Sequence, residues 1–259
     1  MAKIGSPLFI FREECKKDLI AVIEKLAQIG YDGLDFMALF GNKPSAVKNK
    51  LDSCGIEAAG GHIQFEAFVS NTSQLIDDYK EIGCGHITVG APPEDGMPDG
   101  VNYTRTLEEF ARMGEAVNAA GMKLFYHNHA KELKKSANGK TILENILDDM
   151  RPDLLYCELD IGWIGIAGED PAYYLKKYKD RCPALHFKDY IPSGAAKDGF
   201  LFRPTGYGVM DNAALYELSK ACNPEWYIMD HDDAYERDSY FDLSISLDFF
   251  KNLMLVSGK

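Results

Sequence analysis

A phrase that recurs four times constrains the fold of this chain more than any other feature. In each copy a helical pattern ends at a glycine, and a short apolar run follows. The copies read LAQIGYDGLDF, LDSCGIEAAGGHI, YKEIGCGHITV and VNAAGMKLFYH, with glycines at Gly30, Gly55, Gly83 and Gly121. Glycine suits this position because it adopts the left-handed helix cap without a steric penalty. The phrase predicts helices that alternate with strands, and therefore a largely parallel sheet.

Eight apolar runs are interpreted as strands, and each precedes a helical pattern. They cover residues 6–11, 33–38, 58–63, 86–91, 123–128, 154–161, 184–189 and 226–231. Eight strand–helix units within 259 residues fit a closed (β/α)8 TIM barrel, which typically needs about 250 residues. We therefore predict an α/β fold with a single TIM-barrel domain over residues 1–259. A doubly wound open sheet is the structural alternative.

Composition and charge narrow the classes of partner. Hydrophobic residues make up 46% of the chain and charged residues 26%, as in ordinary globular proteins. The 28 basic and 40 acidic side chains leave a formal charge of −12, which opposes binding to nucleic acid or to anionic membranes. We find neither a signal peptide nor an apolar run of bilayer length, and the six cysteines are scattered. We expect a cytoplasmic protein with no nucleic-acid or membrane partner, and a homo-oligomer is compatible with the sequence.

Ionisable residues gather at the predicted carboxyl ends of the strands, where TIM barrels carry their chemistry. This group comprises His62, His127, His129, Asp160, His186 and Asp230. In the stretch FYHNHAKEL, side chains alternate between the two faces of the strand, so His127 and His129 share a face and Asn128 points away. We expect both imidazoles to face the barrel mouth, one near a metal ion and one near the substrate.

The alternation of side chains between the two faces of a strand adds further residues to this group of ionisable side chains. Glu158 shares a face with Asp160, Lys188 with His186, and Asp232 with Asp230. Mixed carboxylate and imidazole ligands suit Mn²⁺, Zn²⁺, Co²⁺ or Mg²⁺. Each of these residues alone is more often a member of an ion pair or a helix cap. Taken together, Asp160, His186 and Asp230 favour a metal-binding or catalytic role.

Several stretches resemble a known family. IGYDGLDF, YHNHAKEL, ELDIGWIGIAGEDP, HFKDY and EWYIMDHDD, in this order, resemble the sugar phosphate isomerase/epimerase family of xylose isomerase-like TIM barrels. Its relatives include inosose dehydratases, keto-sugar epimerases and, distantly, a DNA repair endonuclease. The resemblance implies one divalent ion, with Mn²⁺ favoured over Zn²⁺, Co²⁺ or Mg²⁺. The family holds this ion with a carboxylate or imidazole on the fifth strand, Asp on the sixth, His on the seventh and Glu on the eighth.

This chain matches the family's ligand pattern at two of the four strands. Asp160 and His186 match directly. His127 or His129 stands where many relatives have a fifth-strand Glu, with His127 taken as the ligand here. Asp230 stands where the family has an eighth-strand Glu, and its side chain is shorter by one methylene.

The resemblance implies a metal-dependent isomerase or epimerase of a sugar or keto-sugar. The reaction would remove a proton next to a carbonyl and pass through an enediolate-like intermediate. Glu158, His62 and His129 are the acid and base candidates, and Lys188 would stabilise negative charge. Asp230 is an acid/base candidate as well as a ligand. The alternatives are a lyase acting on a keto-inositol or keto-glycoside, and a non-catalytic sugar-binding barrel.

Candidate substrate contacts lie outside the ligand set. The segment IPSGAAKDGFLFRPTGYGVMD after the seventh strand is long for such a connection, and its Arg203 could close over a ligand. Trp163 could stack on a sugar ring, and Asp232 could bind a hydroxyl group. Because the chain lacks a cluster of basic residues suited to a phosphate, we expect a non-phosphorylated sugar or cyclitol. The negative net charge also argues against a DNA nuclease.

Overall fold

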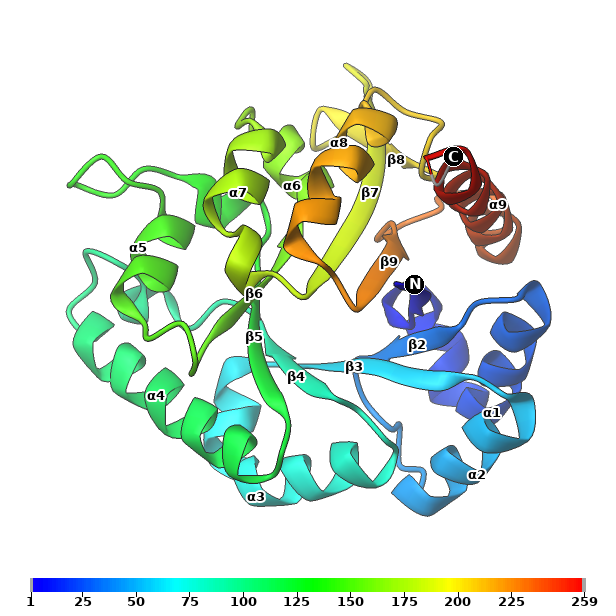
Figure 1. The fold of residues 1–259 in the computed structure, drawn as a ribbon, viewed down its shortest axis with the longest axis horizontal. Coiled ribbons are helices and arrows are strands. Elements are labelled where there is room, and N and C mark those ends of the chain that lie inside the picture. The colour runs from blue at the N-terminus through cyan, green and yellow to red at the C-terminus, as the bar shows by residue number, and fades with distance from the viewer. Residues whose placement is uncertain (1, 258–259) are drawn as a thin grey trace.

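The strands of the computed structural model, which describes residues 2–257, form a closed parallel barrel surrounded by helices (Figure 1). The barrel strands pair in the order β6-β5-β4-β3-β2-β1-β9-β7, and β6 pairs with β7 to close the ring. The predicted α/β TIM barrel is confirmed. The strands are β1 (Lys3–Pro7), β2 (Gly33–Phe36), β3 (Glu57–Ile63), β4 (His86–Val89), β5 (Lys123–His127), β6 (Tyr156–Asp160), β7 (Ala184–Pro192), β8 (Phe200–Arg203) and β9 (Trp226–Asp230).

The helices follow the strands and lie outside the barrel (Figure 1). They are α1 (Arg12–Ile29), α2 (Pro44–Cys54), α3 (Phe65–Glu81), α4 (Tyr103–Ala119), α5 (Ile142–Asp149), α6 (Ile161–Ile166), α7 (Pro171–Lys177), α8 (Asn212–Ser219) and α9 (Ser239–Ser257). Within residues 2–257, none of these helices combines the length and the apolar character needed to cross a membrane.

The four glycines of the recurring phrase adopt the predicted conformation. Gly30, Gly55, Gly83 and Gly121 have φ angles of +102°, +68°, +96° and +79°. At Gly30 the backbone N–H donates to the carbonyls of the last turn of α1, which ends the helix and turns the chain towards β2. The phrase therefore identified real helix ends.

The first strand differs from its prediction. The apolar run at residues 6–11 was expected to be extended, whereas β1 is Lys3–Pro7 and residues Phe9–Phe11 form a 3-10 turn that leads into α1. Pro7 ends the strand, and the N–H of the next residue, Leu8, donates to the carbonyl of Asp35 on β2. The turn leaves Phe9 at the barrel mouth with 41% of its surface exposed.

The side chains that fill the barrel interior change from apolar to ionisable along the barrel axis. Towards the amino-terminal ends of the strands it is filled by apolar side chains from alternate positions, namely Ala59, Phe125, Ala184, Trp226 and Ile228. Towards the carboxyl ends, the next inward positions on β6, β7 and β9 carry Glu158, His186 and Asp230. Because successive inward positions are two residues apart, the ionisable residues form a layer above the apolar floor.

The long segment after the seventh barrel strand is anchored by one carboxylate. β7 continues to Pro192 and pairs antiparallel with β8, which stands outside the barrel. Buried Asp189 accepts hydrogen bonds from the N–H groups of Gly206, Gly208 and Met210 and from the side chain of Asn212. A Cβ on Gly208 would lie 2.1 Å from the Asp189 carboxylate, so this turn requires glycine.

Candidate functional site

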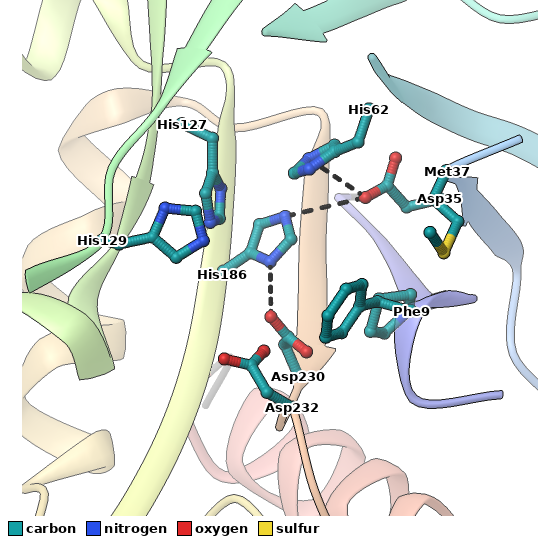
Figure 2. Close-up of a pocket in the computed structure, with 10 residues that line it drawn as sticks. Phe9, Asp35, Met37, His62, His127, His129, His186, Asp230 and Asp232 are labelled. Atoms are coloured by element: carbon teal, nitrogen blue, oxygen red, sulfur yellow. Dashed lines mark hydrogen bonds and ion pairs between the residues drawn. The ribbon is translucent and has the colours of Figure 1, made fainter. Parts of the chain in front are cut away.

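A small cavity of about 100 Å³ opens at the carboxyl ends of the barrel strands (Figure 2). Its polar wall contains the imidazoles of His62, His127, His129 and His186. Three carboxylates, Asp35, Asp230 and Asp232, also line it. The structure therefore brings together the predicted residues from β3, β5, β7 and β9, and both histidines of FYHNHAKEL reach the cavity.

Glu158 lies beneath three imidazoles and is fully buried. Its Oε2 atom is 2.5 Å from His62 Nε2, 3.2 Å from His127 Nδ1 and 3.4 Å from His186 Nε2. Burial alone would raise the pKa of this carboxyl group, but the charges of His62 and His186 hold it well below its usual value. Glu158 is therefore a carboxylate that hydrogen-bonds the rings of His62 and His127 and contacts the ring of His186 as an ion pair.

Lys188 is the buried cation of the site. Its Nζ atom lies 3.1 Å from Asp160 Oδ2, 3.0 Å from Asp230 Oδ2 and 2.7 Å from Asp232 Oδ1. Burial would lower the pKa of this ammonium group, but the three carboxylates raise it above its ordinary value. Lys188 therefore remains charged and forms ion pairs that link the carboxylate of β6 with the two carboxylates at and just after the end of β9.

The pKa values of two cavity imidazoles are displaced in opposite directions. Burial lowers the pKa of His129 to about 3, and the charge of Lys188 contributes to this shift. Burial also disfavours the charged form of His62, but the carboxylates of Asp35 and Glu158 raise its pKa overall. The cavity thus presents one imidazole that stays neutral and can donate a hydrogen bond, and one that binds a proton readily.

Two overlapping sets of side chains could hold a divalent ion. One consists of Asp160, His186 and Asp230, and the other of His62, His127, Glu158 and His186. Within each set the ligand atoms lie within 4.8 Å of one another. The structure thus contains a cluster of His, Glu and Asp residues suited to metal binding.

Unpaired atoms and charge balance test whether a divalent ion fits this cluster. Asp160 Oδ2, Asp230 Oδ1 and His186 Nε2 are buried and form no hydrogen bond, although Asp160 Oδ2 contacts Lys188 as an ion pair. Asp35, Asp230 and Asp232 line the cavity, and Glu158 and Asp160 lie beside it. Lys188 and the imidazoles of His62 and His186, whose pKa values are raised, are three cationic groups among these five carboxyl groups. A buried excess of carboxylates requires cations, so the residues present fit a divalent ion.

The remaining predicted residues occupy different positions. The Trp163 ring packs between His129, at 5.8 Å, and Phe202, at 5.5 Å, and Lys188 Nζ lies 5.1 Å from its centroid. Trp163 therefore closes one side of the site. The guanidinium of Arg203 donates to the carbonyl of Phe202, and Arg203 lies outside the cavity lining. The side chain of Asn128 is buried and bonds both backbone groups of Asp160, which ties β5 to β6.

Sequence reasoning missed four residues of the cavity wall, namely Pro7, Phe9, Asp35 and Met37. Asp35 is 4% exposed, and its Oδ2 lies 3.2 Å from His62 Nε2 and 3.9 Å from His186 Nε2 (Figure 2). A detectable signal was present, since Asp35 is the one charged residue within the apolar strand GLDF. Pro7, Phe9 and Met37 complete the wall, but their position there depends on how β1 and β2 end, and no residue pattern marked them.

Comparison with known proteins adds independent information. Residues 23–251 match the sequence profile described as the xylose isomerase-like TIM barrel. An inosose dehydratase of Geobacillus kaustophilus is 25% identical over 192 residues, which is 65% of this chain and 61% of that relative's length. The aligned region therefore spans less than two thirds of that relative.

Solved structures share the fold. A sugar phosphate isomerase/epimerase of Parabacteroides distasonis superposes with a TM-score of 0.79 at 20% identity, covering 97% of this chain and 94% of that one. A 3-keto-D-glucoside 4-epimerase of E. coli gives a TM-score of 0.73 at 14% identity, covering 97% and 100%. Because the profile match covers most of the sequence, the chain belongs to the xylose isomerase-like TIM barrel family.

Proposed function

We propose that the protein is a divalent-metal-dependent isomerase or epimerase of a non-phosphorylated sugar or keto-sugar. The observation that carries this proposal is the cavity in which His62 and His129 flank a cluster of carboxylates and imidazoles. Removing a proton next to a carbonyl requires a base, an acid and a cation near the developing oxyanion. The cavity wall contains imidazoles that can move a proton, and the cluster of carboxylates and imidazoles would hold the cation.

In this proposal the ion is held by Asp160, His186, Asp230 and His127, and Mn²⁺ suits this mixture of oxygen and nitrogen ligands. When bound, such an ion polarises a carbonyl and makes the adjacent C–H more acidic. Glu158 then acts as a positioning residue, because its contacts with His127 and His186 fix the orientation of both rings. This assignment replaces the direct catalytic role expected for Glu158 from the sequence.

The chain's own residues supply the proton transfer. His62 lines the cavity and its carboxylate neighbours raise its pKa, so it is the stronger base of the two and can move the proton. His129 has a pKa of about 3 and stays neutral, so it can donate a hydrogen bond to a substrate oxygen. Asp232 lines the cavity and can accept hydrogen bonds from substrate hydroxyl groups, and the buried ammonium group of Lys188, 2.7 Å away, orients its carboxylate. Return of the proton to the opposite face gives epimerisation, and its return to the neighbouring carbon gives isomerisation.

The first experiment is metal analysis of the purified protein beside Asp160→Ala, Asp230→Ala and the exposed control Asp153→Ala. We expect nearly one equivalent of divalent metal in the wild type and in Asp153→Ala, and a loss in the other two variants. A panel of keto-sugars in D₂O then tests proton abstraction directly, because deuterium should enter the substrate next to its carbonyl. No retained metal after reloading, or no exchange by the loaded protein, would contradict the proposal.

A lyase is the second candidate, and the likeness to an inosose dehydratase favours it. The same proton abstraction followed by loss of a β-substituent gives an unsaturated ketone in place of an epimer. The two reactions share their first step, so deuterium exchange alone does not distinguish them. The products of the same D₂O experiment do. Appearance of an enone absorbance would identify the lyase. Sugar-dependent stabilisation without either product would identify a binding barrel.

A further inference from the structure

A second, larger cleft continues from the catalytic cavity. It has a volume of about 800 Å³, against about 100 Å³ for the cavity, and shares Phe9, Met37, His62 and His129 with it. Figure 2 shows Phe9 and Met37 on the side of the cavity opposite His129. Resting on the proposed function, we propose that this cleft binds an apolar substituent of the substrate, so that the substrate is a glycoside with an aryl or alkyl aglycone.

The chemistry of the walls supports an apolar occupant. Beyond the shared residues, the cleft is walled by Leu39, Phe40, Ile63, Phe65 and Leu75. Polar side chains also line it, namely those of Asn42, Gln64, Glu66, Asp78 and Lys131. A ligand site whose walls are formed largely by apolar side chains, with polar groups among them, suits a ring or alkyl chain. The polar cavity would hold the sugar and the cleft its substituent.

The opposite side of the cavity is closed to such a substituent. Trp163 packs edge-on against Phe200, at 5.8 Å, and Phe202, at 5.5 Å. Lys188 Nζ lies within 5.4 Å of the ring centroids of both Trp163 and Phe202. Side chains from α6, β7 and β8 therefore fill this side. A ligand larger than the cavity extends towards the turns after β2 and β3, where the cleft lies.

One turn of the cleft holds an aromatic residue in an unfavourable backbone conformation. The N–H of Asn42 donates to the carbonyl of Leu39, and the two residues between them, Phe40 and Gly41, have φ angles of +49° and +78°. A turn of this kind prefers Gly, Asn or Asp at both positions. Phe40 nevertheless occupies the first, and its side chain lines the cleft. The unfavourable backbone is consistent with a function for the ring in ligand binding.

The test compares matched ligands in the metal-loaded protein. Dissociation constants of the methyl and phenyl β-glycosides of glucose, galactose, xylose and 3-keto-glucose are measured by calorimetry. Burying roughly 60 Å² of ring surface at about 25 cal/mol per Å² predicts about tenfold tighter binding of the phenyl member of a pair. Phe40→Asn removes the ring and relieves the backbone, so it should fold normally and reduce this preference to about twofold or less. Val101→Asn, at a residue that is 92% exposed, is the matched control and should retain the full preference.

Each outcome decides the proposal. A phenyl preference lost in Phe40→Asn but kept in Val101→Asn supports the aglycone site. Equal binding within every pair, no measurable binding of any phenyl glycoside, or a preference that survives both Phe40→Asn and Leu39→Asn overturns it. Turnover is scored separately. A preference without deuterium exchange would reject the proposed reaction and keep the cleft, whereas exchange without a preference would reject the cleft alone.

Discussion

Lys188→Met is the substitution whose consequences follow most directly from the geometry. The ammonium group lies within 3.1 Å of carboxylates from Asp160, Asp230 and Asp232, and its side chain is 1% exposed. Removing one partner from a buried ion pair typically costs about 3–5 kcal/mol, because the other charges stay buried without compensation. The metal-free variant should therefore lose about 3 kcal/mol of its free energy of unfolding.

The same substitution should strengthen metal binding. A divalent ion between Asp160 and Asp230 would lie near the lysine, and at roughly 5 Å with an effective dielectric constant of about 20 their repulsion is about 6–7 kcal/mol. The flexible side chain can withdraw, so we expect less than half of this energy in the measured affinity. A gain of about 2.8 kcal/mol corresponds to a dissociation constant about 100-fold lower.

The assay measures both effects of Lys188→Met, namely the lower stability without metal and the higher metal affinity. Wild type, Lys188→Met and the exposed control Lys135→Met are stripped with chelator, titrated with Mn²⁺ and Zn²⁺ by calorimetry, and unfolded in urea with and without metal. Lys188→Met should be less stable than wild type without metal and should recover most of the difference with metal. An unchanged or weaker metal affinity in Lys188→Met would refute the reasoning, because the ion would then lie away from Asp160 and Asp230.

Three further predictions concern carboxylates. Glu158→Gln should weaken metal binding about 10- to 100-fold, since the orientation of two ligand rings would be lost; a calorimetric loss beyond about 1000-fold would indicate that Glu158 contacts the ion itself. Burial opposes ionisation of Glu144, but the Thr141 N–H and Lys177 lower its pKa to about 2. The ionised carboxylate therefore makes its full contribution to the free energy of unfolding above about pH 4.5, and this contribution is lost as the pH falls towards 2. The stability gap between wild type and Glu144→Gln, about 2 kcal/mol at neutral pH, should therefore narrow between pH 5 and pH 3 in urea unfolding; a constant gap would contradict this assignment. Asp189→Ala should cost about 2–3 kcal/mol in urea unfolding because the N–H groups of Gly206, Gly208 and Met210 would lose their acceptor; a loss below about 1 kcal/mol would mean that water replaces the carboxylate.

Local signals predicted the fold because its units repeat. Glycine caps such as Gly30 and Gly121 mark helix ends through backbone sterics alone, and they need no tertiary context. Alternation along strands predicted the inward face that carries Glu158, His186 and Lys188 for the same reason. The first strand was misjudged because an apolar run such as SPLFIF fits a buried turn as well as a strand.

Contacts between distant elements lay beyond sequence reasoning. The side of the strand that carries Lys188 was predicted, but its bonds to carboxylates on β6 and β9 depend on how the barrel closes. Asp35 was missed because no motif pointed to it, although an Asp inside an apolar strand is itself a signal. The cleft beside Phe40 depends on the turns after β2 and β3, whose conformations the residue pattern does not specify.

The charge balance of the site links metal binding to substrate binding. Asp230 is held by both His186 Nδ1, at 3.1 Å, and Lys188 Nζ, at 3.0 Å, so an incoming ion competes with the lysine for the same carboxylate. A substrate that develops negative charge in the cavity would attract Lys188 and release Asp230 for the ion. Because such coupling is reciprocal, an anionic analogue of the enediolate should tighten metal binding, and metal should tighten binding of the analogue by the same factor. In Lys188→Met this coupling should largely vanish, and its persistence there would show that another group carries it.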